Sequence, residues 1–195
     1  MRRDLISSVL GIVAMTIVLG LAYPLVVTAI AQVAFHGQAN GSLIKSDGKV
    51  IGSKLIAQDF KRDPRYFQPR PSTATNYSAS ASAFTNLGPN SKDARDTFKK
   101  NLDAYLELEG PYNPGLTAKS VPIDAVTSSA SGIDPQISVT NARIQAHRIA
   151  KVRRVSLATV DKLVDEHTTG RFIGIFGERG VNVLELNLAL NSLES

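Results

Sequence analysis

The sequence predicts a protein of the α+β class, in which one N-terminal transmembrane helix precedes a single α+β domain. Two observations lead to this fold class. No charged side chain occurs from Leu5 to Phe35, although 20% of all residues are charged. Beyond that run, segments with apolar residues at three- and four-residue spacing alternate with short β-branched segments near glycine and asparagine. The 195 residues therefore divide into a membrane segment and one domain.

The N-terminal apolar run is long enough to cross a bilayer as a helix. About 20 apolar residues span the hydrocarbon core, and the helix expected over residues 5–34 exceeds that length. A cleaved signal peptide is the competing interpretation, because Ala29-Ile30-Ala31 resembles a cleavage site. The apolar region of such a peptide has only about 7–15 residues, so length favours an uncleaved anchor in membrane lipid. Pro24 either marks a transition in this helix or is tolerated without one.

The distribution of basic residues predicts the orientation of the anchor. Arg2 and Arg3 precede the apolar run, and the first Lys or Arg after it is Lys45. Because Lys and Arg are enriched on the cytoplasmic side of membrane spans, residues 1–4 are expected in the cytoplasm and residues 35–195 outside it. We therefore predict a single-pass protein of the plasma (inner) membrane with an extracytoplasmic C-terminal domain.

The first half of this domain predicts a strand, a long loop and a helix. Residues 50–56 are rich in Val and Ile and predict a strand in a small sheet that begins directly after the membrane. Residues 62–90 are rich in Pro, Ser, Ala, Thr and Asn, which is typical of a long irregular segment. Ser91 is expected to cap a helix that runs to about residue 109, since apolar residues recur there at helical spacing.

The second half begins with another loop, over residues 110–135, and continues with two helices. Ser138 is expected to cap a helix over residues 139–153, and Ser156 is expected to cap the next helix. Gln145 lies on the apolar stripe of the first of these helices. That position favours a buried amide with satisfied hydrogen bonds over a ligand contact.

The C-terminal segment predicts one more strand. Residues 181–187 combine Val and Leu with polar residues and are interpreted as a buried strand. A short helix over residues 188–193, begun by Asn187, is expected after it.

The residues that carry catalysis or bind metals and nucleotides in known motifs are missing. Cysteine is absent, which excludes disulfides, cysteine-ligated metals and a cysteine nucleophile. No glycine-rich phosphate loop is present, and the three histidines are too dispersed for a local metal motif. The net charge of +5 comes without a dense Lys/Arg block, which argues against nucleic acid as a partner. We expect no catalytic residues and no metal site.

Short motifs along the whole chain nevertheless resemble one family, the C chain of the Kdp-type potassium-transporting ATPase. None of the motifs is specific alone, but their ordered set is. They include Tyr23-Pro24, Asn40-Gly41-Ser42, Tyr66-Phe67, Arg70-Pro71-Ser72, Asn86-Leu87-Gly88-Pro89-Asn90, Ser129-Ala130-Ser131-Gly132-Ile133-Asp134-Pro135, Arg148-Ile149-Ala150 and Val181-Asn182-Val183-Leu184-Glu185-Leu186-Asn187.

The resemblance implies a non-catalytic subunit of a high-affinity, ATP-driven potassium uptake complex. The implied partners are a potassium-binding, channel-like subunit, a P-type ATPase subunit that hydrolyses ATP, and a second small single-span subunit. The candidate assembly residues that the resemblance supplies are Asn40, Gly41, Ser42, Phe67, Arg70, Pro71, Ser72, Asn86, Gly88, Pro89, Ser131, Gly132, Asp134, Asn182, Glu185 and Asn187.

The resemblance also implies a relation to ATP, since the family is described as a catalytic chaperone that raises the ATP affinity of the ATPase subunit. No tightly bound cofactor is expected, and ATP would be shared transiently with that subunit, with Gln145 as the candidate contact. The predicted orientation conflicts with this role, because it places the domain across the membrane from cytosolic ATP. A domain over the outer mouth of the potassium subunit, which stabilises assembly, agrees better with it.

The alternative function is an anchored or secreted extracytoplasmic binding module or enzyme of unknown substrate. The secreted form requires cleavage near Ala31, and the enzyme requires a catalytic constellation that the sequence does not show.

Overall fold

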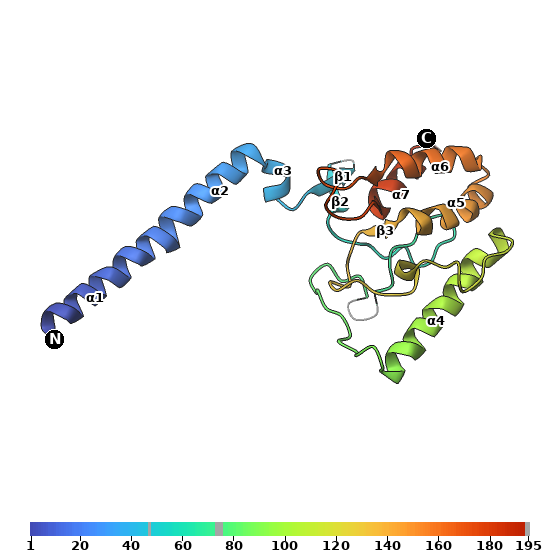
Figure 1. Ribbon diagram of the computed structural model, residues 1–195. Coiled ribbons are helices and arrows are strands. Elements are labelled where there is room, and N and C mark those ends of the chain that lie inside the picture. Colours follow the sequence, from blue (N-terminus) through green and yellow to red (C-terminus); the bar gives the residue numbers. More distant parts are fainter. Residues whose placement is uncertain (47, 73–75, 194–195) are drawn as a thin grey trace. The chain divides into compact units, whose positions relative to one another are not determined.

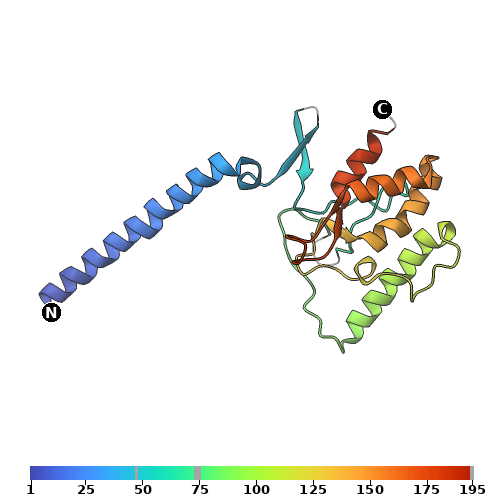
Figure 2. The same ribbon diagram turned by 45° about the horizontal axis from the view of Figure 1, so that its top comes forward.

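The computed structural model describes residues 1–46, 48–72 and 76–193, which form two units, Met1–Ser53 and Lys54–Ser195. Together they are a mixture of helices and short strands (Figures 1 and 2), so the predicted α+β class is confirmed.

The N-terminal unit begins with one continuous apolar helix, Arg2–Ala34, which is long enough to cross a membrane. It consists of α1 (Arg2–Met15), a π-helical segment η1 (Thr16–Ala22) and α2 (Tyr23–Ala34). The π-helical segment ends two residues before Pro24, whose ring lacks an N–H and clashes with the carbonyl one turn earlier. The wider turns accommodate that ring, so Pro24 marks a transition in the helix.

A short helix and a hairpin complete this unit. The helix α3 (His36–Ala39) leads into the antiparallel strands β1 (Leu43–Ser46) and β2 (Lys49–Ser53). A strand was expected over residues 50–56, and β2 confirms it only as far as Ser53. The predicted small sheet follows the apolar helix, with the one-turn helix α3 between them.

The second unit starts with a long segment without helix or strand in its described residues and then forms the helix α4 (Lys92–Glu109). Short 3₁₀ turns follow at η2 (Gly110–Tyr112) and η3 (Ile123–Ala125). The Ser91 hydroxyl accepts a hydrogen bond from the Ala94 N–H at 3.4 Å, which confirms the predicted N-cap.

A three-stranded antiparallel sheet and three helices form the rest of this unit. The elements are β3 (Gln136–Ser138), α5 (Val139–Arg153), α6 (Leu157–Glu166), β4 (Thr168–Thr169), β5 (Gly180–Asn182) and α7 (Val183–Asn191), and the strand order is β3-β5-β4. Ser138 and Ser156 cap α5 and α6 through the N–H groups of Asn141 and Thr159, as predicted.

The predicted strand over residues 181–187 is wrong beyond Asn182. The strand β5 ends there, and α7 begins at Val183 with Asn182 as its N-cap, so the helix does not begin at Asn187. The physical reason is that the Asn182 side chain accepts the Glu185 N–H at 3.1 Å. The apolar residues that follow are buried along a helix, which an alternating pattern in so short a segment does not distinguish from a strand.

The hydrophobic core lies where α5, α6 and α7 pack together with β3 and β5. Its fully buried members include Phe67 from the long irregular segment. The core residues are Phe67, Ile137, Ala142, Ala146, Ile149, Ala150, Val160, Val164, Val181, Val183, Leu186 and Leu190.

Candidate functional site

The segment over residues 64–72 is anchored to the core by side-chain amides in place of a neighbouring strand. The Phe67 N–H donates to Asn187 Oδ1 at 2.8 Å, and Asn187 Nδ2 donates back to the Phe67 carbonyl at 2.9 Å. Phe67 itself is fully buried. Two of the predicted assembly residues therefore contact each other, and they hold the segment against α7.

Gln145 repeats this arrangement one residue further along. Its Oε1 accepts the Gln68 N–H at 2.7 Å and its Nε2 donates to the Gln68 carbonyl at 3.1 Å. The remaining lone pair and N–H bond to Arg148 at 3.1 Å and Asn141 at 3.0 Å. An amide has two donors and two acceptor sites, so all four are used. Gln145 is therefore a buried amide with satisfied hydrogen bonds, the interpretation that the sequence favours.

Arg148 and Glu109 form a fully buried ion pair between α5 and α4. The Arg148 Nε donates to Glu109 Oε1 at 2.9 Å, and both side chains are 0% exposed. The Arg148 Nη1 donates to the carbonyls of Pro64 and Tyr66, the latter at 3.0 Å. A single guanidinium therefore joins both helices to the irregular segment.

The second carboxylate oxygen of Glu109 has no hydrogen-bond partner among the described residues. Burial raises the pKa of Glu109, and the charge and hydrogen bond of Arg148 act in the opposite direction. A buried carboxylate without a second donor depends on Arg148 for compensation of its charge. Loss of either partner would leave an unpaired charge in the core.

Asp124 organises the start of α5. Its carboxylate accepts hydrogen bonds from the Ser138 N–H and hydroxyl, both at 2.8 Å, and from Asn141 Nδ2 at 3.0 Å. The Tyr105 hydroxyl donates to Asn141 Oδ1 at 2.9 Å, and burial raises the pKa of Tyr105. This network thus continues from α4 to the Gln145 amide.

Sequence reasoning missed Glu109, Arg148 and Asp124 as a network. One signal for Glu109 was available, since it lies four residues after Tyr105 and continues the apolar stripe of α4. Arg148 lies three residues after Gln145 and therefore on the same side of α5.

A second cluster gathers around Arg70. Its guanidinium donates to the Ser128 carbonyl at 3.1 Å and lies 3.4 Å from Asp134 Oδ2. The Tyr77 hydroxyl donates to the Arg70 carbonyl at 2.8 Å, and burial raises the pKa of Tyr77 to about 12. Ser72 accepts the Tyr77 N–H at 3.0 Å. The structure thus brings together three predicted residues, Arg70, Ser72 and Asp134.

The remaining predicted residues lie at turns and element ends. In the N-terminal unit, Asn40 donates to the His36 carbonyl, Ser42 has a positive φ, and the Gly41 carbonyl accepts the Ser53 hydroxyl. In the second unit, Asn182 and Glu185 lie at the start of α7, and Glu185 pairs with Lys54 at 2.5 Å. The others lie in loops. Pro71 lines a cleft beside α4. Asn86, Gly88 and Pro89 precede α4, and Ser131 and Gly132 precede β3.

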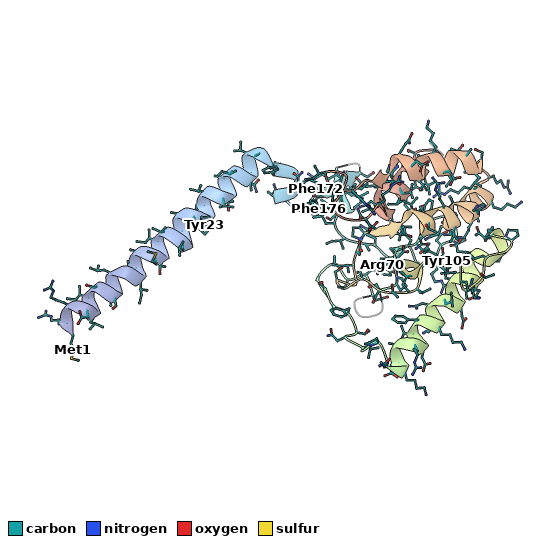
Figure 3. All side chains as sticks on the ribbon, in the orientation of Figure 1. Met1, Tyr23, Arg70, Tyr105, Phe172 and Phe176 are labelled. Atoms are coloured by element: carbon teal, nitrogen blue, oxygen red, sulfur yellow. The ribbon has the colours of Figure 1, made fainter. Side chains whose placement is uncertain are left out.

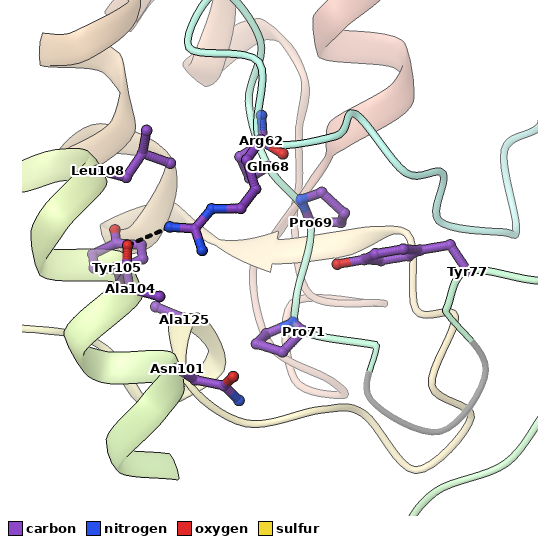
Figure 4. Close-up of a pocket in the computed structure, with 10 residues that line it drawn as sticks. All are labelled: Arg62, Gln68, Pro69, Pro71, Tyr77, Asn101, Ala104, Tyr105, Leu108 and Ala125. Atoms are coloured by element: carbon purple, nitrogen blue, oxygen red, sulfur yellow. Dashed lines mark hydrogen bonds between the residues drawn. The ribbon is translucent and has the colours of Figure 1, made fainter. Parts of the chain in front are cut away.

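The cleft beside α4 has a volume of about 160 Å³ (Figure 4). Its walls come from α4 and the irregular segment, and Arg62 bridges them through a 2.5 Å hydrogen bond to the Ala104 carbonyl. Small-molecule sites usually have roughly 300–1,000 Å³. A nucleotide is too large for this cleft as it stands.

Comparison with known proteins decides the family. Residues 5–192 match the family model described as KdpC, the C chain of the K⁺-transporting ATPase. The chain belongs to the KdpC family. It is 45% identical over 194 residues to the potassium-transporting ATPase KdpC subunit of Mycobacterium tuberculosis (strain H37Rv), which covers 99% of this chain and 100% of that protein. The KdpC subunit of Paraburkholderia phytofirmans is 48% identical over 182 residues, 92% of each chain.

Membership of the KdpC family establishes the general function of the chain. The chain is a subunit of a K⁺-transporting ATPase and takes part in potassium transport. Its helix Arg2–Ala34 is one candidate membrane span within the described residues, in agreement with a membrane-anchored subunit.

Replacing Arg148 with Met should destabilise the second unit strongly. The substitution removes the charge that compensates buried Glu109, and breaking such a pair costs about 3–5 kcal/mol. The free energy of unfolding is measured by denaturant titration of the detergent-solubilised full chain.

Arg143→Met on the same helix is the matched control. The pair between Arg143 and Asp165 is 54% exposed on both sides, so its loss should cost less than about 1 kcal/mol. Equal losses of stability in the two variants would show that the Arg148 ion pair does not hold the fold together.

Proposed function

We propose that this chain is the accessory, non-hydrolysing subunit of a high-affinity potassium uptake complex. Its partners in the proposal are the potassium-binding, channel-like subunit, the P-type ATPase subunit and a second small single-span subunit. Membership of the KdpC family is the observation that carries the proposal.

In this proposal the domain lies outside the cytoplasm and stabilises assembly from that side, over the mouth of the potassium subunit. Support comes from Arg2 and Arg3 before the apolar helix, with Lys45 as the first Lys or Arg after it.

An effect on ATP affinity is then indirect. The domain binds no nucleotide tightly, and it changes ATP binding by stabilising one arrangement of the ATPase subunit in the complex. The saturated Gln145 amide, which has no hydrogen-bonding group left for a nucleotide, supports this part of the proposal.

Assembly is tested by affinity purification of the tagged full chain from cells that contain the whole transport system. Potassium-stimulated ATPase activity should copurify, because the hydrolysing subunit is a partner. The same tag in cells without the partner subunits provides the background. A chain that elutes alone from the complete system contradicts the proposal.

Topology is tested by adding a protease to sealed right-side-out vesicles. The domain should be digested, because residues 35–195 are proposed to lie on the outer face. Inside-out vesicles serve as the control, and there the domain should resist until detergent is added. Protection in right-side-out vesicles would place the domain in the cytoplasm and make direct contact with ATP feasible.

The role of Gln145 is tested by Gln145→Ala. The substitution leaves the Gln68 N–H and carbonyl without their partners, and each unsatisfied buried group costs about 1–3 kcal/mol. Stability of the full chain should fall, whereas the ATP concentration for half-maximal activity of the assembled complex should stay unchanged. Gln38→Ala, at an exposed amide in α3, should alter neither quantity. Weaker ATP binding by a normally stable Gln145→Ala complex would indicate a direct nucleotide contact.

A further inference from the structure

The loop between β4 and β5 exposes four large apolar side chains within five residues. Phe172, Ile173, Ile175 and Phe176 are 74%, 72%, 74% and 63% exposed. The loop joins β4 to the buried strand β5, and Figure 3 labels its two phenylalanines. An apolar cluster of this kind marks an interaction site on a soluble surface.

The backbone holds this loop in one shape. The N–H groups of Phe172 and Phe176 each donate to the carbonyl of the other residue, at 2.8 and 3.0 Å. Outside this pair, Arg171 and Glu178 close the loop through an ion pair at 3.0 Å. Gly174 supplies a positive φ of 76° at the turn. A preformed loop loses little conformational freedom when it docks.

Ile173 adds an independent observation. It has a φ of 52°, in the left-handed region that a β-branched side chain rarely adopts. Strained backbone of this kind concentrates at binding and switch sites. Asn would adopt this conformation with less strain. Because the Ile173 side chain is exposed, packing within the domain does not explain why an isoleucine stands here.

The charges beside the loop favour a protein over a bilayer as its occupant. Loops that lie in anionic membranes have a surplus of basic residues beside the apolar ones. Here Arg171 is neutralised by Glu178, whose side chain is 85% exposed and would meet the headgroups as a carboxylate. Of the three charged residues in the loop, Arg171, Glu178 and Arg179, only Arg179 has no ion pair with another described residue.

We propose that residues 171–179 are a docking loop, whose apolar side chains insert into an apolar pocket on the outer face of the potassium-binding partner subunit. This inference rests on the proposed function, which places the domain against that subunit. Arg179 meets an acidic group at the rim of the pocket. Buried aromatic anchors surrounded by polar groups are the usual energetic centre of an interface.

The loop anchors a larger contact and does not form the whole of it. A phenylalanine buries about 150–250 Å² in an interface, whereas a specific complex needs roughly 1,000 Å² or more. Other surfaces of the chain therefore contribute area, and the loop contributes a disproportionate share of the affinity.

The test uses the tagged full chain, coexpressed with its partner subunits and purified in detergent. Phe172→Ser and Ile175→Ser should each reduce the amount of potassium-binding subunit retained per tagged chain at least tenfold. Ile123→Ser is the matched control, because Ile123 is 73% exposed elsewhere in the same unit, and its retention should equal that of the wild type. Thermal unfolding of all three variants should match the wild type, since the side chains are exposed.

The outcomes separate this inference from the function on which it rests. If the wild type retains its partners and the loop variants do so equally, the docking loop is overturned and the proposed function stands. If the wild type retains no partner, both are overturned. If the loop variants keep their partners in detergent but lose binding to partner-free anionic vesicles, the loop is a lipid contact and the inference is wrong.

Ile173→Asn is expected to change two measured quantities, the melting temperature and the retention of the partner, in different directions. Asn tolerates the left-handed conformation, so the melting temperature of the domain should stay the same or rise. Retention of the partner should nevertheless fall, because an apolar anchor is lost. A purely structural role for Ile173 predicts the reverse, a lower melting temperature with normal retention.

Discussion

The second unit depends on the pairing of one buried cation with one buried anion. Arg148 and Glu109 are completely removed from solvent, and each compensates the charge of the other. The remaining N–H groups of the Arg148 guanidinium donate to the carbonyls of Pro64 and Tyr66 in the irregular segment and to Gln145 Oε1. Two helices and a long irregular segment are therefore fixed by one side chain, whose planar fork supplies several donors at set angles.

Side-chain amides in this domain form the hydrogen bonds to backbone groups that a neighbouring strand usually forms. Gln145 and Asn187 each bond to both the N–H and the carbonyl of one residue in the irregular segment. Backbone groups that are buried need such partners. Phe67 and Asn187, two of the predicted assembly residues, thus belong to the framework of the domain, which leaves its exposed surfaces as the regions available for contact with other subunits.

The helices could be predicted because their capping signals are local. The buried polar network around Arg148 and Glu109 could not, because its partners lie far apart in the sequence. Ser91, Ser138 and Ser156 cap helices through N–H groups three residues away, so a short window of sequence contains the whole interaction. The start of α7 was mistaken because a strand and a helix share the same apolar pattern over so few residues. Arg148 and Glu109 are 39 positions apart, and charged side chains are expected at the surface, so nothing local indicates that they meet.

The bond between Phe67 and Asn187 has a consequence for how the chain acquires its structure. The two residues are separated by 120 positions, and the first leaves the ribosome long before the second has been synthesised. The aromatic ring and its backbone groups remain without their final partners through that whole interval. Completion of the domain therefore waits for α7, and until then the chain around Phe67 lacks its native hydrogen bonds and stays open to chaperones or a translocation machinery.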